Sequence, residues 1–154
     1  MAALPTLPSG EDRNESRRYR LVVADDHQDV LEEIRALLIP DFELVGTVKD
    51  GEELVAAAAK LRPDAVVCDI WMPGPNGIEC GAEILRNGYC HAVVVLTMCS
   101  DAPVVRHALR QGIQGYVLKE DAGNELIPAV RAVLAGGRYL SSGVLDKGQS
   151  DTRL

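Results

Sequence analysis

The stretch Ala65–Cys68, AVVC, is apolar at every position and is followed at once by the carboxylate Asp69. Such a run suits a strand that is buried on both faces, as in a parallel sheet covered by helices. Four further runs with this character are predicted to be strands: Arg20–Ala24, Glu43–Val48, Ala92–Leu96 and Gly115–Leu118.

The segments between these strands show helical periodicity. Apolar residues recur at helical spacing within Val30–Leu38, Leu54–Leu61, Ile78–Leu85, Val104–Leu109 and Leu126–Leu134. Pro128 is expected near the first turn of the last helix, where its missing N–H does least harm. Alternating strands and helices predict an α/β fold: a five-stranded parallel doubly wound sheet, order 2-1-3-4-5, flavodoxin-like. Ligands of such sheets bind at the carboxyl ends of the strands.

Length and composition narrow the class of protein. The 154 residues, 47% hydrophobic and 25% charged, are typical of about one globular domain and exclude a wholly disordered or fibrous chain. The net charge of −7 makes direct nucleic-acid binding by this chain a poor expectation, and no apolar run is long enough to span a membrane. The expected units are a flexible tail (1–18), one domain (19–140) and a polar tail or linker remnant (141–154). The four cysteines are expected to be buried, reduced thiols.

Polar residues close four of the predicted strands. Asp25 and Asp26 follow the first strand, Asp69 the third, Thr97 the fourth and Lys119 the fifth. Because parallel strands end at the same edge of the sheet, these side chains are expected to gather there. The bland alternative is that the three aspartates are solvated turn residues or helix N-caps.

The predicted cluster has a definite chemistry. Carboxylates about 4 Å apart repel by roughly 4 kcal/mol at an effective dielectric constant near 20, so positive charge must offset them. Lys119 supplies one charge, and oxygen ligands favour Mg²⁺ or Mn²⁺ as a second. An ammonium and a metal together suit a phosphoryl group, and a carboxylate such as Asp69 can act as the nucleophile that accepts it.

The sequence strongly resembles the receiver domain of bacterial two-component response regulators, over about residues 19–140. The resemblance is carried by VVADDH (Val22–His27), CDIWMPGPNGIE (Cys68–Glu79), VVVLTMCSD (Val93–Asp101) and GYVLKEDA (Gly115–Ala122). It implies a phosphoacceptor signalling switch, not an enzyme acting on a separate substrate, that receives its phosphoryl group from a sensor histidine kinase.

The resemblance also implies a role for each site residue. Asp69 would be the phosphoacceptor. Asp26, Asp69 and the backbone carbonyl of Trp71 would bind Mg²⁺ or Mn²⁺, with Asp25 acting through water. Thr97 would be the switch hydroxyl and Lys119 would pair with the phosphoryl group. Tyr116 would be an aromatic switch that turns inward; the alternative is a tyrosine packed at a sheet edge with its hydroxyl in water.

The motif sequences most resemble those of the class whose output domain is a LuxR-type helix-turn-helix. Residues 138–154 are too short to form that module. The resemblance implies a cytoplasmic protein that controls an output such as transcription through the face formed by the fourth helix, fifth strand and fifth helix, with a homodimer as one assembly. Three alternatives stay open: a phosphorylation-independent interaction module of the same fold, a hydrolase of the aspartyl-phosphate type, and a flavin or nucleotide-binding module.

Overall fold

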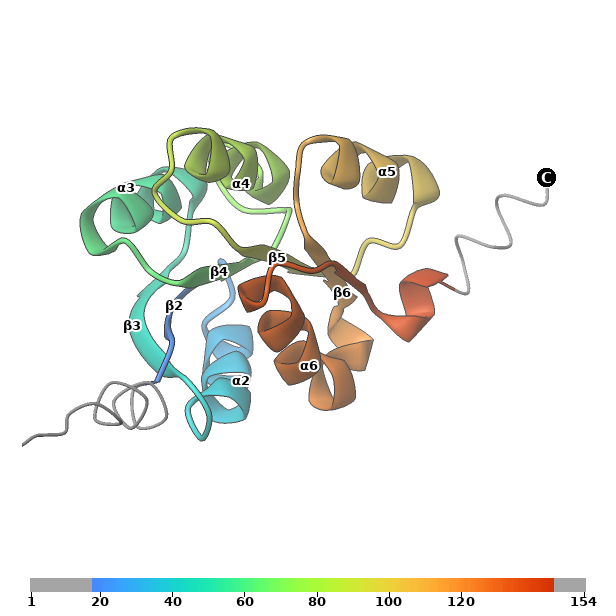
Figure 1. Cartoon of the computed structure of the whole chain (residues 1–154), viewed down its shortest axis with the longest axis horizontal. Helices are drawn as coiled ribbons and strands as arrows, with labels where there is room; N and C mark the ends of the chain where they lie inside the picture. Colours follow the sequence, from blue (N-terminus) through green and yellow to red (C-terminus); the bar gives the residue numbers. More distant parts are fainter. Residues whose placement is uncertain (1–17, 146–154) are drawn as a thin grey trace, which may run out of the picture.

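A six-stranded parallel sheet forms the centre of the molecule (Figure 1) in the computed structural model, which describes residues 18–145. Its order is β3-β2-β4-β5-β6-β7. The strands are β2 (Arg20–Ala24), β3 (Glu43–Val48), β4 (Ala65–Cys68), β5 (Val93–Thr97), β6 (Gly115–Leu118) and β7 (Tyr139–Leu140). The first five follow the predicted order 2-1-3-4-5, and β7 adds a short sixth strand beside β6.

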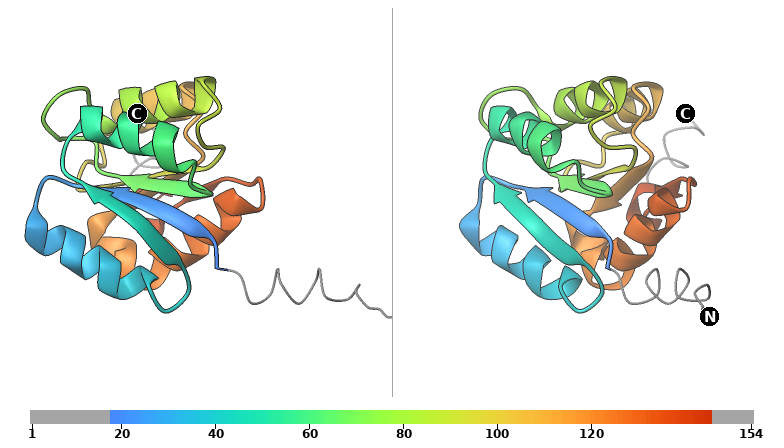
Figure 2. Two further views of the ribbon diagram at one scale, coloured as in Figure 1. Left: turned by 90° about the vertical axis from the view of Figure 1, so that its left-hand side faces the viewer. Right: turned by 60° about the vertical axis from the view of Figure 1, so that its left-hand side comes forward.

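Helices cover both faces of the sheet, as Figures 1 and 2 show. One face is covered by α2 (Gln28–Leu38) and α6 (Ala122–Leu134). The other is covered by α3 (Gly51–Leu61), α4 (Gly77–Arg86) and α5 (Ala102–Arg110). Two buried apolar clusters fill the layers, so β2, β4, β5 and β6 are buried on both sides, as their continuous apolar runs predict.

Side-chain caps fix where two helices near the site begin. The Asp50 carboxylate accepts a hydrogen bond from the Glu53 backbone N–H at the start of α3. Asn76 and Glu79 form a reciprocal capping box at the start of α4. Each cap satisfies backbone donors that a helix leaves unpaired, which stabilises the helix by about 1 kcal/mol. The α4 cap therefore anchors the far end of the loop that follows Asp69.

Two expectations differ from the structure. α6 begins at Ala122, so Pro128 lies inside the helix and not near its first turn. Its ring nitrogen cannot donate to the Asn124 carbonyl, four residues earlier. The helix starts early because the 3₁₀ turn η1 (Lys119–Asp121) runs directly into it.

The second difference concerns the carboxyl-terminal boundary. Residues 142–145 form a helical turn, and Ser141 and Val144 are buried, so the packed unit continues past residue 140. The sequence does not predict burial of this segment, because it is mostly polar and Val144 is its one residue in a buried apolar cluster. The rest of the predicted tails, 1–17 and 146–154, lies outside the described residues. Within residues 18–145, no helix has the length and apolar character needed to cross a membrane.

Candidate functional site

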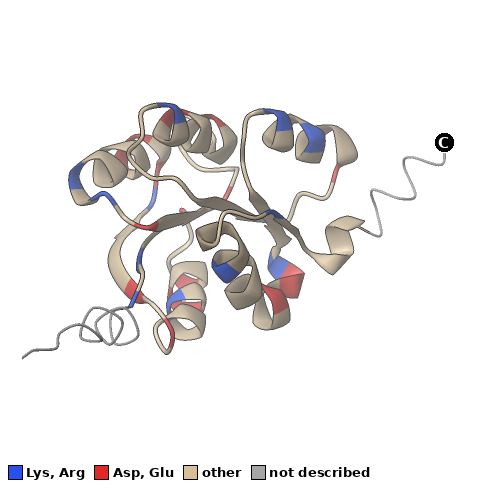
Figure 3. Cartoon of the chain, in the orientation of Figure 1, with Lys and Arg blue, Asp and Glu red and all other residues tan. Residues whose placement is uncertain are grey.

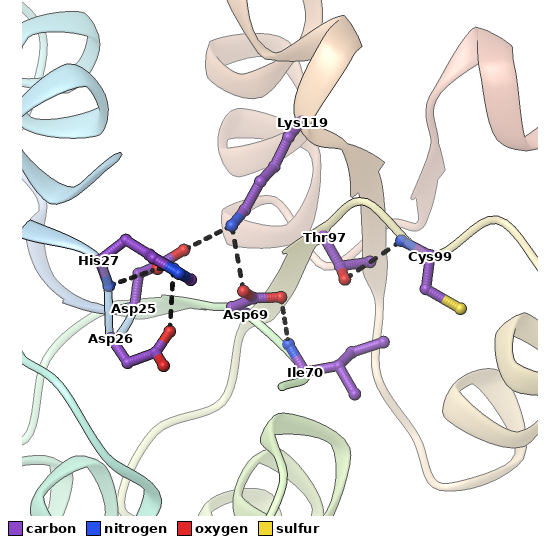
Figure 4. Close-up of polar contacts among 8 residues, drawn as sticks. All are labelled: Asp25, Asp26, His27, Asp69, Ile70, Thr97, Cys99 and Lys119. Carbon is purple, nitrogen blue, oxygen red and sulfur yellow. Dashed lines mark hydrogen bonds and ion pairs between the residues drawn. The ribbon is translucent and has the colours of Figure 1, made fainter. Parts of the chain in front are cut away.

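Three carboxylates meet at the carboxyl end of the central strands (Figure 4). Asp25 and Asp26 follow β2, and Asp69 follows the neighbouring strand β4. Asp25 is 1% exposed and Asp69 is 6% exposed. Together with Lys119, which begins η1 after β6, we call these residues the acidic cluster. The sheet thus brings together side chains from distant parts of the sequence, as the strand-end pattern predicts.

Lys119 bridges two carboxylates of the acidic cluster. Its ammonium donates a hydrogen bond to Asp69 Oδ2 at 3.0 Å and forms an ion pair with Asp25 Oδ2 at 2.7 Å. Burial alone would lower the pKa of Lys119, but the hydrogen bonds and charges of Asp25 and Asp69 outweigh it and raise that pKa above its ordinary value. The lysine is therefore held in its charged form between two acids.

Backbone contacts fix the direction of the Asp69 carboxylate. Its Oδ1 accepts the backbone N–H of Ile70 at 2.7 Å, while Oδ2 faces Lys119 (Figure 4). The loop then turns back, and the Gly77 N–H donates to the Ile70 carbonyl at 2.8 Å. A Cβ at Gly77 would collide with the Asp69 carbonyl, so this close approach requires glycine.

Two oxygens of the acidic cluster fit a divalent cation. Asp25 Oδ2 and Asp26 Oδ1 are buried and accept no well-formed hydrogen bond from residues 18–145. Their ionic partners are Lys119 for the first and His27 Nδ1, 3.0 Å away, for the second. Ligand atoms of Asp25, Asp26 and His27 lie within 4.8 Å of one another. Carboxylate oxygens of this kind are suitable ligands for Mg²⁺ or Mn²⁺, and an ion bound there would compete for them with the Lys119 and His27 nitrogens.

The other predicted metal ligands, Asp69 and the Trp71 carbonyl, are not part of this group of ligand atoms. Asp69 is outside that three-residue group, and both of its oxygens already accept hydrogen bonds. The Trp71 side chain is 59% exposed, and the role of its backbone carbonyl stays a prediction. His27, which precedes α2 next to the acidic pair, is a contact that strand-end reasoning did not include.

Two hydroxyl side chains come from the neighbouring strands β5 and β6, and we call Thr97, the last residue of β5, and Tyr116, the second residue of β6, the hydroxyl pair. The Thr97 hydroxyl accepts the Cys99 backbone N–H at 3.3 Å. The Tyr116 hydroxyl donates to the Cys99 carbonyl at 2.6 Å, and its ring is fully buried. Burial raises the pKa of this phenol, and negative groups nearby add to the effect. Tyr116 therefore points inward, and a hydroxyl left in water is the wrong interpretation.

Within the described part of the chain, Thr97 makes no hydrogen bond to Asp69. Its partner lies in the loop after β5, as Figure 4 shows. That partner, Cys99, is the one cysteine of the four that is partly exposed; the other three are buried, and burial raises the pKa of each of those thiols. No sequence signal identifies the Cys99 backbone as the shared partner of both hydroxyls.

Residues 21–131 match the response regulator receiver domain family. The chain belongs to this family. Transcriptional regulatory protein DegU of Brevibacillus brevis is 37% identical to it over 132 residues, covering 84% of this chain and 56% of DegU. Response regulator GacA of Pseudomonas protegens is 37% identical over 124 residues, covering 79% of this chain and 58% of GacA. The receiver domain thus spans little more than half the length of these curated relatives.

Solved structures agree with this assignment. A two-component response regulator of the LuxR family from Aurantimonas sp. SI85-9A1 superposes with a TM-score of 0.81 at 30% identity, covering 89% of this chain and 99% of that one. The isolated REC domain of RcsB from Salmonella enterica serovar Typhimurium, solved with the phosphomimetic BeF3−, gives a TM-score of 0.77 at 29% identity and covers 84% and 98%. The predicted family, its LuxR-type class and the fold are therefore confirmed.

Proposed function

We propose that this receiver domain is a phosphoacceptor switch in which Asp69 takes a phosphoryl group from a phosphohistidine of a sensor histidine kinase. The observation that supports this most directly is the Asp69 carboxylate, held by the Ile70 N–H and Lys119 beside two further aspartates. An oriented carboxylate can act as the nucleophile toward phosphorus. The neighbouring ammonium can neutralise phosphoryl oxygens as the transfer proceeds.

The acidic cluster also supports metal-dependent transfer. Asp26, Asp69 and the Trp71 carbonyl would hold Mg²⁺ or Mn²⁺, with Asp25 acting through water, and the ion would supply positive charge to the phosphoryl oxygens. Three carboxylates face one ammonium in this cluster, so its formal charge is negative before a cation binds. This imbalance favours a divalent ion and disfavours a bare phosphate.

The hydroxyl pair supports a switch coupled to that transfer. The Thr97 hydroxyl accepts the Cys99 N–H, so its own proton stays available to donate to a phosphoryl group. Movement of Thr97 toward that group would stretch its contact with the loop after β5. Tyr116 is bonded to the same residue, so the two hydroxyls respond together. Phosphorylation would then shift the population of conformations at the α5–β6–α6 face.

The α5–β6–α6 face would bind the partners of this domain. α5 carries Arg106 and Arg110 and no acidic residue, so its charge differs from that of the acidic chain as a whole (Figure 3). DegU and GacA are both named as regulators, and this chain covers 56% and 58% of their lengths. We propose control of transcription in the cytoplasm through a separate output domain, with a homodimer as one assembly.

Intact-mass spectrometry tests the phosphoacceptor assignment. The protein is incubated with acetyl phosphate and Mg²⁺, in parallel with Asp69→Asn, the control variant Asp101→Asn and wild type plus chelator. One phosphoryl group is expected on wild type and on Asp101→Asn, and none on Asp69→Asn or with chelator. Labelling of Asp69→Asn at the wild-type rate would exclude Asp69, and multiple turnover of phosphate esters would favour a hydrolase.

A further inference from the structure

The chain returns to the sheet after α6 and extends the hydrogen-bond ladder of β6. β7 pairs with Gly115 and Tyr116, and the Ser141 N–H donates to the Tyr116 carbonyl at 3.0 Å. Beyond this point the Ser141 side chain continues the ladder, because its Oγ accepts the Leu118 N–H at 3.1 Å. Ser141 is 0% exposed. Its hydroxyl therefore serves a strand end that water does not reach.

The same segment holds the residues on the other side of Lys119. The Gly143 N–H donates to Asp121 Oδ2 at 3.0 Å, at the end of η1. The Ser142 N–H and the Tyr139 hydroxyl donate to the Glu125 carboxylate at 3.1 Å and 2.8 Å. The contact is close: a Cβ on Gly143 would lie 2.7 Å from Leu118 Cδ1 and 2.9 Å from Asp121 Oδ2.

Lys119 lies between these two attachments, one at Leu118 and one at Asp121. We infer that residues 139–145 position Lys119 for phosphoryl transfer, with the buried Ser141 hydroxyl as the main positioning residue. This rests on the proposed function of Asp69 and Lys119 and adds to it a segment that follows the matched family region, residues 21–131. Ser141 contacts neither Asp69 nor the ammonium, and it acts through the Leu118 backbone.

Phosphoryl transfer depends on the position of the Lys119 ammonium. A buried N–H that loses its acceptor must find another, so removing the Ser141 hydroxyl makes the end of β6 shift or open. Lys119 is the next residue, and its ammonium must remain within hydrogen-bond distance of Asp69 Oδ2. Displacements of about 1 Å in such a group are enough to slow a positioned reaction by up to about 100-fold.

The test compares Ser141→Ala with Ser142→Ala, the same change at the next residue. The Ser142 side chain is exposed, and its backbone N–H, which donates to Glu125, is unchanged by the substitution. Three quantities are measured: the rate of phosphoryl gain from acetyl phosphate, the affinity for beryllofluoride with Mg²⁺ saturating, and the affinity for Mg²⁺ alone from Trp71 fluorescence. For Ser141→Ala we expect the first two to fall about tenfold, and Mg²⁺ affinity to stay within about twofold because Lys119 does not hold the metal. Ser142→Ala should resemble wild type.

A second pair of variants keeps the inference testable if Ser141→Ala fails to fold. Asp121→Ala removes the acceptor of the Gly143 N–H, and Asp121→Asn restores an acceptor oxygen. We expect Asp121→Ala to slow phosphoryl gain about threefold to fivefold and Asp121→Asn to recover it, on the scale of one hydrogen bond. Amide hydrogen exchange at Leu118 should also become at least tenfold faster in Ser141→Ala, since the donor loses its acceptor.

The outcomes separate this inference from the proposed function. A wild-type protein that gains no phosphoryl group would contradict the proposed function itself. A wild-type protein that reacts, with a Ser141→Ala variant reacting within twofold of it, would overturn only the positioning role. Equal losses of Mg²⁺ and beryllofluoride affinity in Ser141→Ala would also overturn it, because they would show a general structural role.

Discussion

The acidic cluster and the hydroxyl pair come from neighbouring strands of the sheet but are held in different ways. The acidic cluster is tied internally, since Lys119 contacts both Asp25 and Asp69. The hydroxyl pair is tied to the loop after β5, through the two backbone groups of Cys99. The first arrangement holds two carboxylates around one partly buried ammonium. The second is oriented by the loop, and the Thr97 hydroxyl accepts there while its own proton remains available.

Of the two hydrogen bonds made by the hydroxyl pair, the Thr97 contact is the weaker. Its 3.3 Å distance to the Cys99 N–H is long for a hydrogen bond, whereas the Tyr116 contact of 2.6 Å is short. Breaking the Thr97 contact is therefore expected to cost less free energy than breaking the Tyr116 contact. The acidic cluster and the hydroxyl pair are therefore held by separate contacts, and variants can remove these contacts one at a time.

The largest effect is expected from Lys119→Ala, which removes the positive member of the acidic cluster. Phosphoryl gain should slow by about 100-fold, as for loss of one oriented charge-stabilising group in an active site. The rate is followed by intact mass, with the exposed Lys60→Ala as the matched control. If the rate holds while the melting temperature with Mg²⁺ falls sharply, Lys119 is structural and not reactive.

Asp26→Asn should change metal binding and stability in opposite directions. It removes a metal ligand, so Mg²⁺ affinity measured by Trp71 fluorescence is expected to fall more than tenfold. It also removes one of three repelling carboxylates, a repulsion of about 4 kcal/mol per pair at 4 Å and a dielectric constant near 20. The melting temperature in chelator should therefore rise. A lower melting temperature in chelator would mean that the cluster is not electrostatically strained.

A smaller effect is expected from Thr97→Ala, which removes one hydroxyl of the hydroxyl pair. Mg²⁺ affinity should stay within about twofold, because Thr97 is not a ligand, while phosphoryl gain slows about fivefold through loss of one hydrogen bond. The response of Tyr116, read by its NMR signals with beryllofluoride, should disappear. Thr97→Ser keeps the hydroxyl and should behave as wild type; a full Tyr116 response in Thr97→Ala would separate the two hydroxyls.

The smallest effect belongs to Tyr116→Phe, which removes the short bond to Cys99. The free energy of unfolding at neutral pH should fall by about 1 kcal/mol, with phosphoryl gain unchanged. The raised pKa of Tyr116 adds a pH dependence. Above about pH 10 the unfolded phenol loses its proton while the folded one keeps it, so stability falls as pH rises.

Lys119, whose pKa is also raised, adds to the same alkaline loss, because the stability from its ion pairs disappears as its ammonium deprotonates. Denaturant titrations between pH 7 and 11 should show a shallower decline for Tyr116→Phe than for wild type. Equal slopes would mean that the Tyr116 phenol is not protected in the folded protein.

The predictable part of the molecule follows from patterns that are local in sequence. β4 and β6 match their predicted bounds because apolar runs buried on both faces are visible residue by residue. The carboxylates of Asp25 and Asp69 were placed together because parallel strands share an edge. The start of α6 was missed because Ala122, Gly123 and Asn124 carry no large apolar side chain to mark its first turn.

The hydrogen-bond partners within the site could not be predicted from the sequence. Which group accepts the Tyr116 hydroxyl depends on the path of the loop after β5, and backbone acceptors leave no mark on the sequence. β7 has only two residues, too few to show a period. The Ser141 hydroxyl was equally hidden, since serine near a chain end is typical of exposed linkers and here is buried.

The order of the sheet has a consequence for synthesis on the ribosome. β4 joins β2, and β5, β6 and β7 are then added at one growing edge in the order in which they are translated. Domains begin to fold from the amino-terminal side during synthesis. Asp25 and Asp69 are therefore placed together before Lys119 is available, and the nascent sheet carries uncompensated negative charge until β6 docks. Docking of β6 brings Lys119 to the two carboxylates and relieves that repulsion before β7 completes the sheet.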